Sequence, residues 1–590
     1  MLLVLFLGCT TETADSADVP VGALGAGRTN PFPSVELVAD GHLAFTAADL
    51  PIIDGGTAWD LGRLNVRAGF SVVQPAIVDL GVAVDEASVS GPDRVATDGT
   101  VRMVDLDTGT ALWCFAELDA AEEAVASGLR TLIVRPMEPL PDGHRVAVVV
   151  TSGVTSGGAP LSLPAPEGHY ADLHAELAPL GQDDVVLAWD FPVSRERRVL
   201  DGALAQLGSP GGGIVTELRE SGGETAPPAG LWRLGEGTFT STAFLVDEVR
   251  LELDADGLPV AQGPRDAYLM VAIPDSVKDA APGSVPVLVF GHGILSEPWD
   301  YFGKSDDPSG MIALSNALGV IVVATKWTGL SDEDQVHAIE VAGDFARFHE
   351  VPEMLVQGVA DTVSLLGAVH GGTMLDDPAF AGLADPSQVW YHGISLGGIE
   401  GATTLANQDV VTRGVLHVGG AAWATMLERS SNWPPFDLVV TRTFPDPATR
   451  QMLYATTQLY WDPVDPAVHA DRLTGGTWLW QESIGDEQVP NLTTELLARA
   501  VGLPLGTPGH TTPPGLTTVA LPIAGKALTQ FDPEVGLPDA NNRPASRSGA
   551  HGAPRLWPGT QAQAAHFLTT GEVAHFCGEA PCSASNPGSW

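Results

Sequence analysis

The sequence predicts two consecutive domains, an all-β domain followed by an α/β domain with a mostly parallel sheet. Residues 28–207 contain short valine-rich runs separated by turn residues, a pattern typical of a β-sandwich. Residues 239–590 contain apolar strands that alternate with helical segments, and this alternation indicates a parallel sheet. Residues 208–238 are rich in Gly, Pro, Ser and Glu and are predicted to be a linker.

Within the first domain, strands are expected at residues 101–104, 131–135 and 145–150. Residues 140–144 form a Leu-Pro-Asp-Gly-His turn signal, in which proline fixes φ and glycine supplies a positive φ. Residues 132–160 resemble bacterial immunoglobulin-like modules, in which a similar turn leads into a valine-rich strand. This part is therefore predicted to be an immunoglobulin-like β-sandwich.

The second domain is expected to begin with a strand-turn-strand unit at residues 249–253 and 267–273. The strands that follow are continuously apolar, which fits a sheet buried on both faces. Its further expected elements, in chain order, are strand 285–290, helix 310–318, strand 320–325, helix 353–369, strand 388–392, helix 398–407, strand 477–483, helix 493–501 and helix 561–568.

The run Gly393-Ile394-Ser395-Leu396-Gly397 stands between an apolar strand and a helix. A Gly-x-Ser-x-Gly turn in this context is typical of a nucleophile elbow, in which the serine hydroxyl stands clear of the backbone at the positive end of a helix. The flanking glycines avoid steric clash in that turn. Ser395 is therefore the predicted nucleophile of a serine hydrolase. The alternative is a glycine-rich surface turn.

A second glycine-rich turn, Gly291-His292-Gly293-Ile294, follows the strand at 285–290. In a serine hydrolase of this architecture, the loop at this place supplies one backbone N–H of the oxyanion hole, and the residue after the nucleophile supplies the other. The expected donors are the N–H groups of Ile294 and Leu396. The alternative is a turn of glycines with His292 packed beneath it.

The catalytic acid is expected after a later strand, and Asp486 follows the strand at 477–483. A carboxylate there can accept a hydrogen bond from histidine Nδ1–H and stabilise the imidazolium. Asp486 is therefore the predicted acid. The competing carboxylates are Glu482, Glu487, Asp462 and Asp465.

The general base is expected last in the chain order Ser, Asp, His. His551 lies in a Gly/Ser-rich loop immediately before the last helix and is the predicted base. The other histidines downstream of Asp486 fit less well. His510 lies in a coil, His566 in a helical run, and His575 beside a cysteine near the chain end.

With these residues in place, residues 239–590 resemble the α/β-hydrolase superfamily. More narrowly, the chain resembles bacterial secreted lipolytic lipoproteins, the virulence-factor lipase group, some of which act on lysophospholipids. Leu396 departs from the glutamine expected after the serine, but only its backbone N–H is required. The features that carry the resemblance are Asn30–Pro33, Gly69–Ser71, Trp189–Pro192, Gly291–Gly293, Gln357–Gly358, Gly393–Ile399, His551 with Gly552 and Arg555, Phe567–Gly571, and Cys577.

The resemblance implies a serine esterase or lipase that hydrolyses ester or lipid substrates through an acyl-enzyme and needs no metal or organic cofactor. A peptidase or a polyester depolymerase would use the same triad. A non-catalytic surface-binding lipoprotein is an alternative of a different class. In a further alternative, the β domain binds a partner or glycan on which the hydrolase acts.

Residues 421–472, between two predicted sheet strands, are the expected cap. Their aromatic density suits an apolar acyl-binding cleft, and simple packing of an inserted helical pair is the alternative. The aromatic residues are Trp423, Trp433, Phe436, Phe444, Tyr454, Tyr460 and Trp461.

Residues 1–9 are apolar and end in Leu-Gly-Cys, which resembles a bacterial lipoprotein signal with Cys9 as the acylated residue. The missing basic segment and Phe6 in place of leucine depart from that pattern, and an ordinary secretory signal is the alternative. Residues 10–27 suit a flexible tether. The segment 1–27 thus predicts an exported protein, lipid-anchored at the outer membrane or cell surface of a Gram-negative bacterium.

The remaining cysteines fit an oxidising compartment. Cys577 and Cys582 are expected to form a small disulfide loop, and Cys114 lies in an apolar run as a buried thiol. No cysteine–histidine spacing resembles a zinc site.

The formal net charge is −44, and lysine occurs only at positions 278, 304, 326 and 526. So acidic a chain argues against nucleic-acid binding and against adhesion to anionic lipid by charge. The charge indicates nothing specific about substrate.

Overall fold

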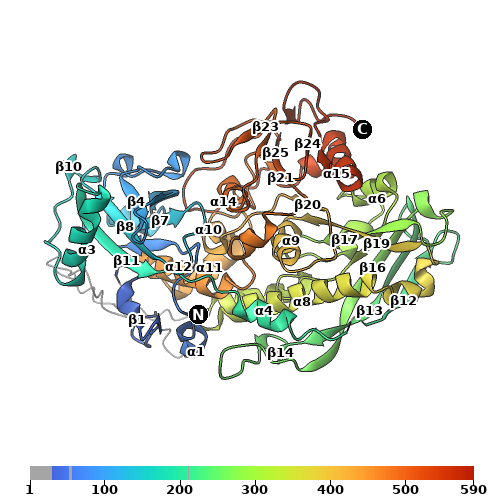
Figure 1. The fold of residues 1–590 in the computed structure, drawn as a ribbon, viewed down its shortest axis with the longest axis horizontal. Coiled ribbons are helices and arrows are strands. Elements are labelled where there is room, and N and C mark those ends of the chain that lie inside the picture. Colours follow the sequence, from blue (N-terminus) through green and yellow to red (C-terminus); the bar gives the residue numbers. More distant parts are fainter. Residues whose placement is uncertain (1–29, 52–55, 210) are drawn as a thin grey trace, which may run out of the picture.

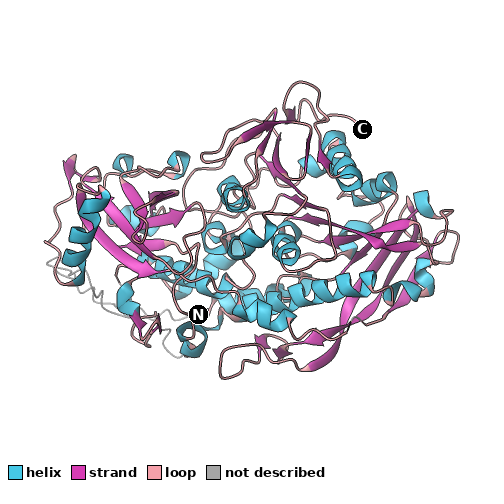
Figure 2. Cartoon of the chain, viewed as in Figure 1, coloured by secondary structure: helices cyan, strands magenta, loops and turns pink. Residues whose placement is uncertain are grey.

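A large mixed sheet dominates the fold, and helices cover both of its faces (Figures 1 and 2). The computed structural model describes residues 30–51, 56–209 and 211–590. Within these residues the order of the strands along the sheet is β12-β13-β16-β18-β17-β19-β20-β21-β25-β22-β23, and β27 pairs with β25. Their bounds are β12 Gly213–Glu220, β13 Leu231–Ala243, β16 Gly263–Pro274, β17 Val285–Gly291, β18 Ile321–Ala324, β19 Ala384–Ile394, β20 Gly414–His417, β21 Trp478–Ser483, β22 Leu505–Thr507, β23 Thr518–Ala520, β25 Ala527–Asp532 and β27 Cys582–Ser583.

The strands β12, β13, β16 and β18 pair antiparallel, and every pair from β18 through β17, β19, β20 and β21 to β25 is parallel. The carboxyl ends of the parallel strands therefore meet at one edge of the sheet, where loops can bring side chains together. A mostly parallel sheet with a Gly-x-Ser-x-Gly turn at the end of one strand is the α/β-hydrolase fold. The predicted fold class is confirmed.

The two faces of the sheet bury alternate side chains of the same strands. In β17, Val287 and Val289 pack with α8 (Glu350–His370), α9 (Leu396–Ala406) and α14 (Asn491–Val501). Leu288 and Phe290 pack with α6 (Met311–Leu318) and α15 (Pro558–Thr570) on the opposite face. This two-residue alternation, with both sets apolar, is why the strands are continuously hydrophobic.

The N-terminal residues form two small antiparallel sheets around a shared core, in agreement with the predicted β domain. One sheet has the order β11-β8-β4-β5 and the other β3-β7-β6. Trp189 and Phe191 of β11 are fully buried in that core. The bounds are β3 Ala76–Val78, β4 Val101–Asp105, β5 Ala111–Leu112, β6 Cys114–Leu118, β7 Leu132–Pro136, β8 Arg145–Thr151 and β11 Val185–Pro192.

The predicted linker at 208–238 is wrong, because β12 and the first part of β13 lie within it and pair in the large sheet. β12 is the edge strand and none of its residues is buried, so its composition carries no signal of a buried strand. Close packing of β12 against β13 explains the glycine at position 237. A Cβ at Gly237 would lie 1.9 Å from the carbonyl oxygen of Ile214, so only glycine allows the two strands this close.

Helices between β20 and β21 occupy the predicted cap segment. They are α10 (Trp423–Leu427), α11 (Pro434–Thr443), α12 (Pro447–Trp461) and α13 (Pro466–His469). They pack directly on the β domain, as the orange and blue segments of Figure 1 show. Phe70 of the β domain belongs to the same hydrophobic core as Leu453 and Trp461 of α12. The β domain and the cap therefore share one core.

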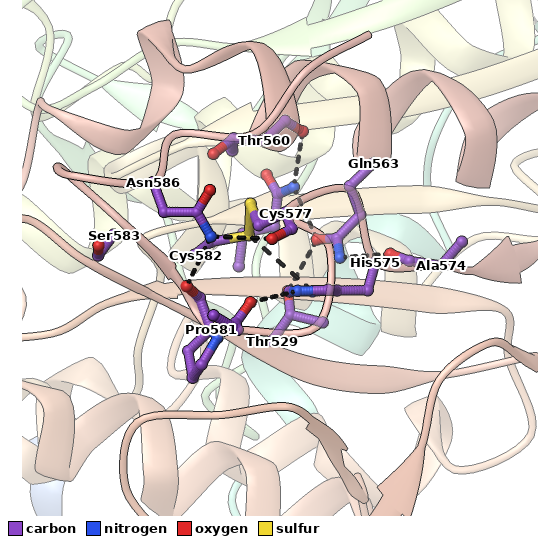
Figure 3. The surroundings of a disulfide bond; sticks show 12 residues. Thr529, Thr560, Gln563, Ala574, His575, Cys577, Pro581, Cys582, Ser583 and Asn586 are labelled. Atoms are coloured by element: carbon purple, nitrogen blue, oxygen red, sulfur yellow. Dashed lines mark hydrogen bonds between the residues drawn. A yellow bond between two sulfur atoms is a disulfide. The ribbon is translucent and has the colours of Figure 1, made fainter.

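A disulfide joins Cys577 to Cys582, as the sequence predicted, and Figure 3 shows its surroundings. The side chain of Asn586 donates to the carbonyl oxygen of Cys577 at 2.8 Å, and Cys582 opens β27 beside β25. The loop thus ties the chain end to the large sheet. Cys114 is buried, also as predicted, and burial raises the pKa of its thiol to about 12.

Cys9 and the signal and tether segment 1–27 lie outside the described residues. Among the residues that the structure does describe, no helix combines the length and the apolar character needed to cross a bilayer.

We expect Gly237→Ala to destabilise the protein, because its methyl group would overlap the Ile214 carbonyl oxygen and force β12 away from β13. The expected loss is about 1–3 kcal/mol of unfolding free energy, measured by denaturant titration. Gly475→Ala is the matched control, since a Cβ there meets nothing within 4 Å. Equal stability of the two variants would contradict the packing explanation.

Candidate active site

Ser395 occupies the turn between β19 and α9 in a conformation that non-glycine residues rarely adopt. Its φ is 59° and its ψ is −118°. Its N–H donates to the carbonyl oxygen of His417 at 2.9 Å, and its own carbonyl oxygen accepts from the N–H groups of Gly398 and Ile399. Such strain costs on the order of 1–3 kcal/mol and persists only where surrounding contacts enforce it. The turn therefore has the backbone geometry expected of a nucleophile elbow.

Close backbone packing explains the glycines of the motif. A Cβ at Gly393 would lie 1.8 Å from the carbonyl oxygen of Gly397, and a Cβ at Gly397 would lie 2.1 Å from that of Gly291. The Tyr391 hydroxyl donates to the Gly397 carbonyl oxygen at 2.6 Å and fills the remaining space. Any side chain at these glycines would push helix α9 away from the sheet.

Asp486 and His551 form a buried hydrogen-bonded pair at the same edge of the sheet. Imidazole Nδ1 lies 2.8 Å from Asp486 Oδ2 and 2.9 Å from Oδ1. Asp486 follows β21, and its Oδ1 also accepts from the N–H groups of Gln488 and Val489 at 2.8 and 2.9 Å. The pair fixes the tautomer with hydrogen on Nδ1, so Nε2 is free to accept a proton.

The topology brings this pair to the side of Ser395. β19, β20 and β21 are successive neighbours in the sheet, so Ser395 and Asp486 leave its edge two strand spacings apart, or about 10 Å. Ser395 also lines one cavity together with Gln488 and Val489, the two residues whose N–H groups bind Asp486. The structure thus brings the three predicted residues to one edge.

Glu487, a competitor for the acid position, holds the loop that carries the base. Its Oε2 accepts from the N–H of His551 and from the Ser548 hydroxyl, both at 3.0 Å. Burial favours the neutral acid, but these hydrogen bonds outweigh it and keep the pKa of Glu487 below its ordinary value. The Ser483 hydroxyl donates to the carbonyl oxygen of Ala550 at 2.7 Å and adds a second anchor.

The other competing carboxylates have structural partners elsewhere. Glu482 accepts from the side chains of Asn491 and Gln530, and burial raises its pKa well above the ordinary value. Asp462 binds Arg67, and Asp465 accepts from the first N–H groups of α10 and α13.

The competing histidines also have partners away from Ser395. His510 and His575 bond to the carbonyl oxygens of Cys582 and Ala580, and His566 bonds to Glu572.

The two predicted oxyanion donors are the backbone N–H groups of Ile294 and Leu396. Among the described residues, neither the Ile294 N–H nor the Leu396 N–H has a hydrogen-bond partner. Neighbouring bonds hold the first loop on both sides, because Gly293 N–H donates to the Tyr301 hydroxyl at 2.9 Å and Leu295 N–H to the Leu330 carbonyl at 2.7 Å. Such fixed donors suit an anion that develops during reaction.

At Gly293 this loop passes directly over Ser395, and a Cβ there would overlap the Tyr301 hydroxyl at 2.7 Å. A Cβ at Gly293 would lie 3.6 Å from Ser395 Cβ and 3.9 Å from Ser395 Oγ. His292 is packed beneath the loop: its Nδ1 bonds to the Gly293 carbonyl oxygen and its Nε2 accepts from the Trp327 N–H at 2.9 Å. Burial lowers the pKa of His292 to about 4, so it is neutral and holds the loop in place.

A predominantly apolar cavity opens beside Ser395 and encloses about 810 Å³, including its mouth to solvent. One wall is the cap, where Trp423 and Trp461 stack with ring centroids 4.5 Å apart. The polar lining residues besides Ser395 are Ser430, Asn432 and Gln488.

Sequence reasoning missed the opposite wall, which comes from the long connection between β18 and α8. Its lining residues are Leu330, Ala338, Val341, Ala342 and Phe348, three of them on α7 (Gln335–Ala342), and Val351 at the start of α8 adjoins them. The only signal was the length of that connection, since long loops in compact domains are often functional.

In the described part of the chain, two groups of side chains have a spacing that could hold a metal ion, and neither group lies at this site. One group of suitable spacing is His575 with the two disulfide cysteines, whose sulfurs are bonded to each other. The other is Asp105, Asp107 and His144 on a turn of the β domain, where His144 Nδ1 bonds Asp105 directly at 3.0 Å.

No protein-family model matches the chain, and no curated protein matches it. Solved structures similar to it include acetyl xylan esterase 1 from Thermoanaerobacterium sp. JW/SL YS485, at 17% identity and a TM-score of 0.34 over 59% of this chain and 88% of that one. A puromycin-hydrolyzing peptidase of Mycobacterium tuberculosis has 16% identity and a TM-score of 0.32 over 57% and 45% of the two chains. The acylaminoacyl peptidase of Pyrococcus horikoshii has 13% identity and a TM-score of 0.31 over 62% and 50%. At such low identity these similarities say nothing about substrate.

Proposed function

We propose that this protein is a serine hydrolase that cleaves carboxylic esters of apolar acids through an acyl-enzyme intermediate. The observation that carries the proposal is the strained Ser395 elbow, with two unused N–H groups beside it and an apolar cavity in front of it. The Asp486–His551 pair supplies the base that the serine needs.

In the proposed reaction Ser395 Oγ attacks the ester carbonyl carbon while His551 Nε2 takes its proton. Asp486 stabilises the imidazolium, and the Ile294 and Leu396 N–H groups bind the oxyanion. When the tetrahedral intermediate collapses, His551 gives the proton to the leaving alcohol. Water, deprotonated by His551, then attacks the acyl-enzyme. The Ser395 Oγ–carbon bond breaks, His551 returns the proton to Ser395 Oγ, and the acid is released.

The cavity favours an ester of an apolar acid over a peptide. Its described lining carries no charged side chain, and its walls are aliphatic and aromatic. A site for an extended peptide requires donors and acceptors for the peptide backbone, which would be left unpaired against such walls. Medium or long acyl chains, as in acylglycerols or lysophospholipids, suit these walls.

We expect Ser395→Ala to lower kcat on p-nitrophenyl butyrate by at least about 10⁴-fold, because the covalent intermediate can no longer form. Asp486→Asn should lower kcat by about 10³- to 10⁴-fold, since the amide favours the wrong imidazole tautomer. A fluorophosphonate probe should label the wild type and not Ser395→Ala.

Ser276→Ala is the control, because Ser276 is an exposed serine far from the elbow in sequence. Turnover that survives in Ser395→Ala would disprove the nucleophile. A folded wild type that ignores both the ester and the probe would favour a binding protein, and cleavage of peptides alone would favour a peptidase.

We expect Ala338→Phe to shift the substrate preference towards short acyl chains. Ala338 lines the cavity on α7, and a phenyl ring there would occupy the space of the distal acyl carbons. The kcat/KM ratio of p-nitrophenyl palmitate to acetate should fall by roughly tenfold or more. Val336→Phe on the exposed side of the same helix should leave the ratio unchanged. Equal ratios in the two variants would place the acyl chain elsewhere.

We propose in addition that the protein is exported and anchored to the outer membrane or cell surface through acylated Cys9. The Cys577–Cys582 disulfide supports export, because disulfides persist in oxidising compartments. In a Gram-negative host the full chain should enter the membrane fraction with an acylated N-terminal peptide, and Cys9→Ser should not. An intact Met1 peptide in the wild type would refute processing at Cys9.

A further inference from the structure

The stacked pair Trp423–Trp461 forms the cap wall of the acyl cavity. Among the described residues, neither indole Nε1 has a hydrogen-bond partner. The rings therefore take their positions from packing and from the helices that carry them. Trp423 opens α10, and Trp461 closes α12.

The end of α12 is fixed by Arg67 of the β domain. Asp462, directly after Trp461, forms an ion pair with Arg67 and accepts from the Ser71 hydroxyl. Arg67 Nη1 also donates to the carbonyl oxygen of Leu459 at 2.8 Å. The side chains of Arg67 and Asp462 are 3% and 0% exposed, so water does not compete for these bonds. Arg67 thus binds the backbone of α12 at Leu459 and also the side chain of Asp462, the residue next to Trp461.

The end of α10 is fixed by Arg135 on strand β7 of the β domain. Arg135 pairs with Glu428, which follows α10, and its Nε lies 2.6 Å from Glu117 Oε1 of β6. Arg429 pairs with the other oxygen of Glu117. The cluster holds two positive and two negative side chains, all buried, so its charges are balanced.

We propose that Arg67 and Arg135, defined here as the arginine clamp, determine acyl-chain specificity by fixing the Trp423–Trp461 wall from the β domain. The inference rests on the proposed esterase function. The planar guanidinium suits this role because Arg135 joins two carboxylates and Arg67 joins a carboxylate to a carbonyl, whereas a lysine ammonium lacks the fork. The β domain is then a structural part of the substrate site.

Most bonds that hold the catalytic loops lie outside the clamp, and a direct link from its Arg135 end is the Ser431 N–H, which donates to the carbonyl oxygen of Glu487 at 2.7 Å. His551 is held by Asp486 and by Glu487, and both lie in the loop after β21. The oxyanion loop is held by Tyr301, His292 and Leu330. Loosening the clamp should therefore weaken binding of long acyl chains and spare the chemistry on a short ester.

Arg67→Lys and Arg135→Lys, which retain the charge and remove the fork, test the clamp. On p-nitrophenyl octanoate kcat/KM should fall roughly tenfold, mainly through a higher KM, while the value on the acetate changes less than about threefold. Arg102→Lys is the matched control, because Arg102 lies in β4 and pairs with the half-exposed Asp184. It should leave both values unchanged.

Hydrogen exchange on the wild-type full chain gives a readout that needs no variant and no activity. The amides of α10 and α12 should exchange as slowly as those of the buried helix α9. Fast exchange in α10 and α12, or equal losses on octanoate and acetate in folded Lys variants, would overturn the clamp. If the wild type hydrolyses neither ester, the proposed esterase function is wrong. Hydrogen exchange alone then tests whether α10 and α12 are held in place as the clamp requires.

Discussion

The close approach of β17, β19 and α9 is the constraint on which the rest of the site depends. Gly291, Gly393 and Gly397 allow backbone contacts that any Cβ would prevent, and the Tyr391 hydroxyl seals the junction with a hydrogen bond. This packing forces Ser395 into its strained turn and brings the oxyanion loop over it. One set of contacts thus places both the proposed nucleophile and the proposed oxyanion donors, as a preorganised site requires.

A second layer of polar contacts positions the remaining groups. Glu487 and Ser483 hold the His551 loop, and neutral His292 holds the oxyanion loop. Each of these buried groups forms a hydrogen bond with a backbone group of the loop it holds. It therefore fixes one loop geometry, and the hydrogen bond offsets the free-energy cost of burying a polar group. Glu487 is therefore a support for the His551 loop and not a second candidate acid.

The β domain and the cap share one hydrophobic core and the buried pairs Arg67–Asp462 and Arg135–Glu428. Buried ion pairs add little net stability. They disfavour other arrangements of the two domains, because a separated partner would be a buried charge without a counter-ion or water. The domain boundary predicted near residue 208 reflects composition only. An exposed edge strand such as β12 has a linker-like composition because one face and one edge meet water.

The sequence by itself determined strands β17, β18, β19 and β21 of the α/β domain with helices α6, α8, α9, α14 and α15, and it placed the elbow at Ser395, Asp486 after β21, His551 before the last helix, and the cysteine pair. These features are local: hydrophobic period, turn chemistry and chain order encode them within a few residues. The sequence did not indicate the sheet strands β20 and β25. Only the tertiary structure decided the second cavity wall on α7, the role of Glu487, and the membership of β12 in the sheet. Contacts such as Arg67 with Asp462, 395 residues apart, leave no local pattern because packing in three dimensions selects the partner.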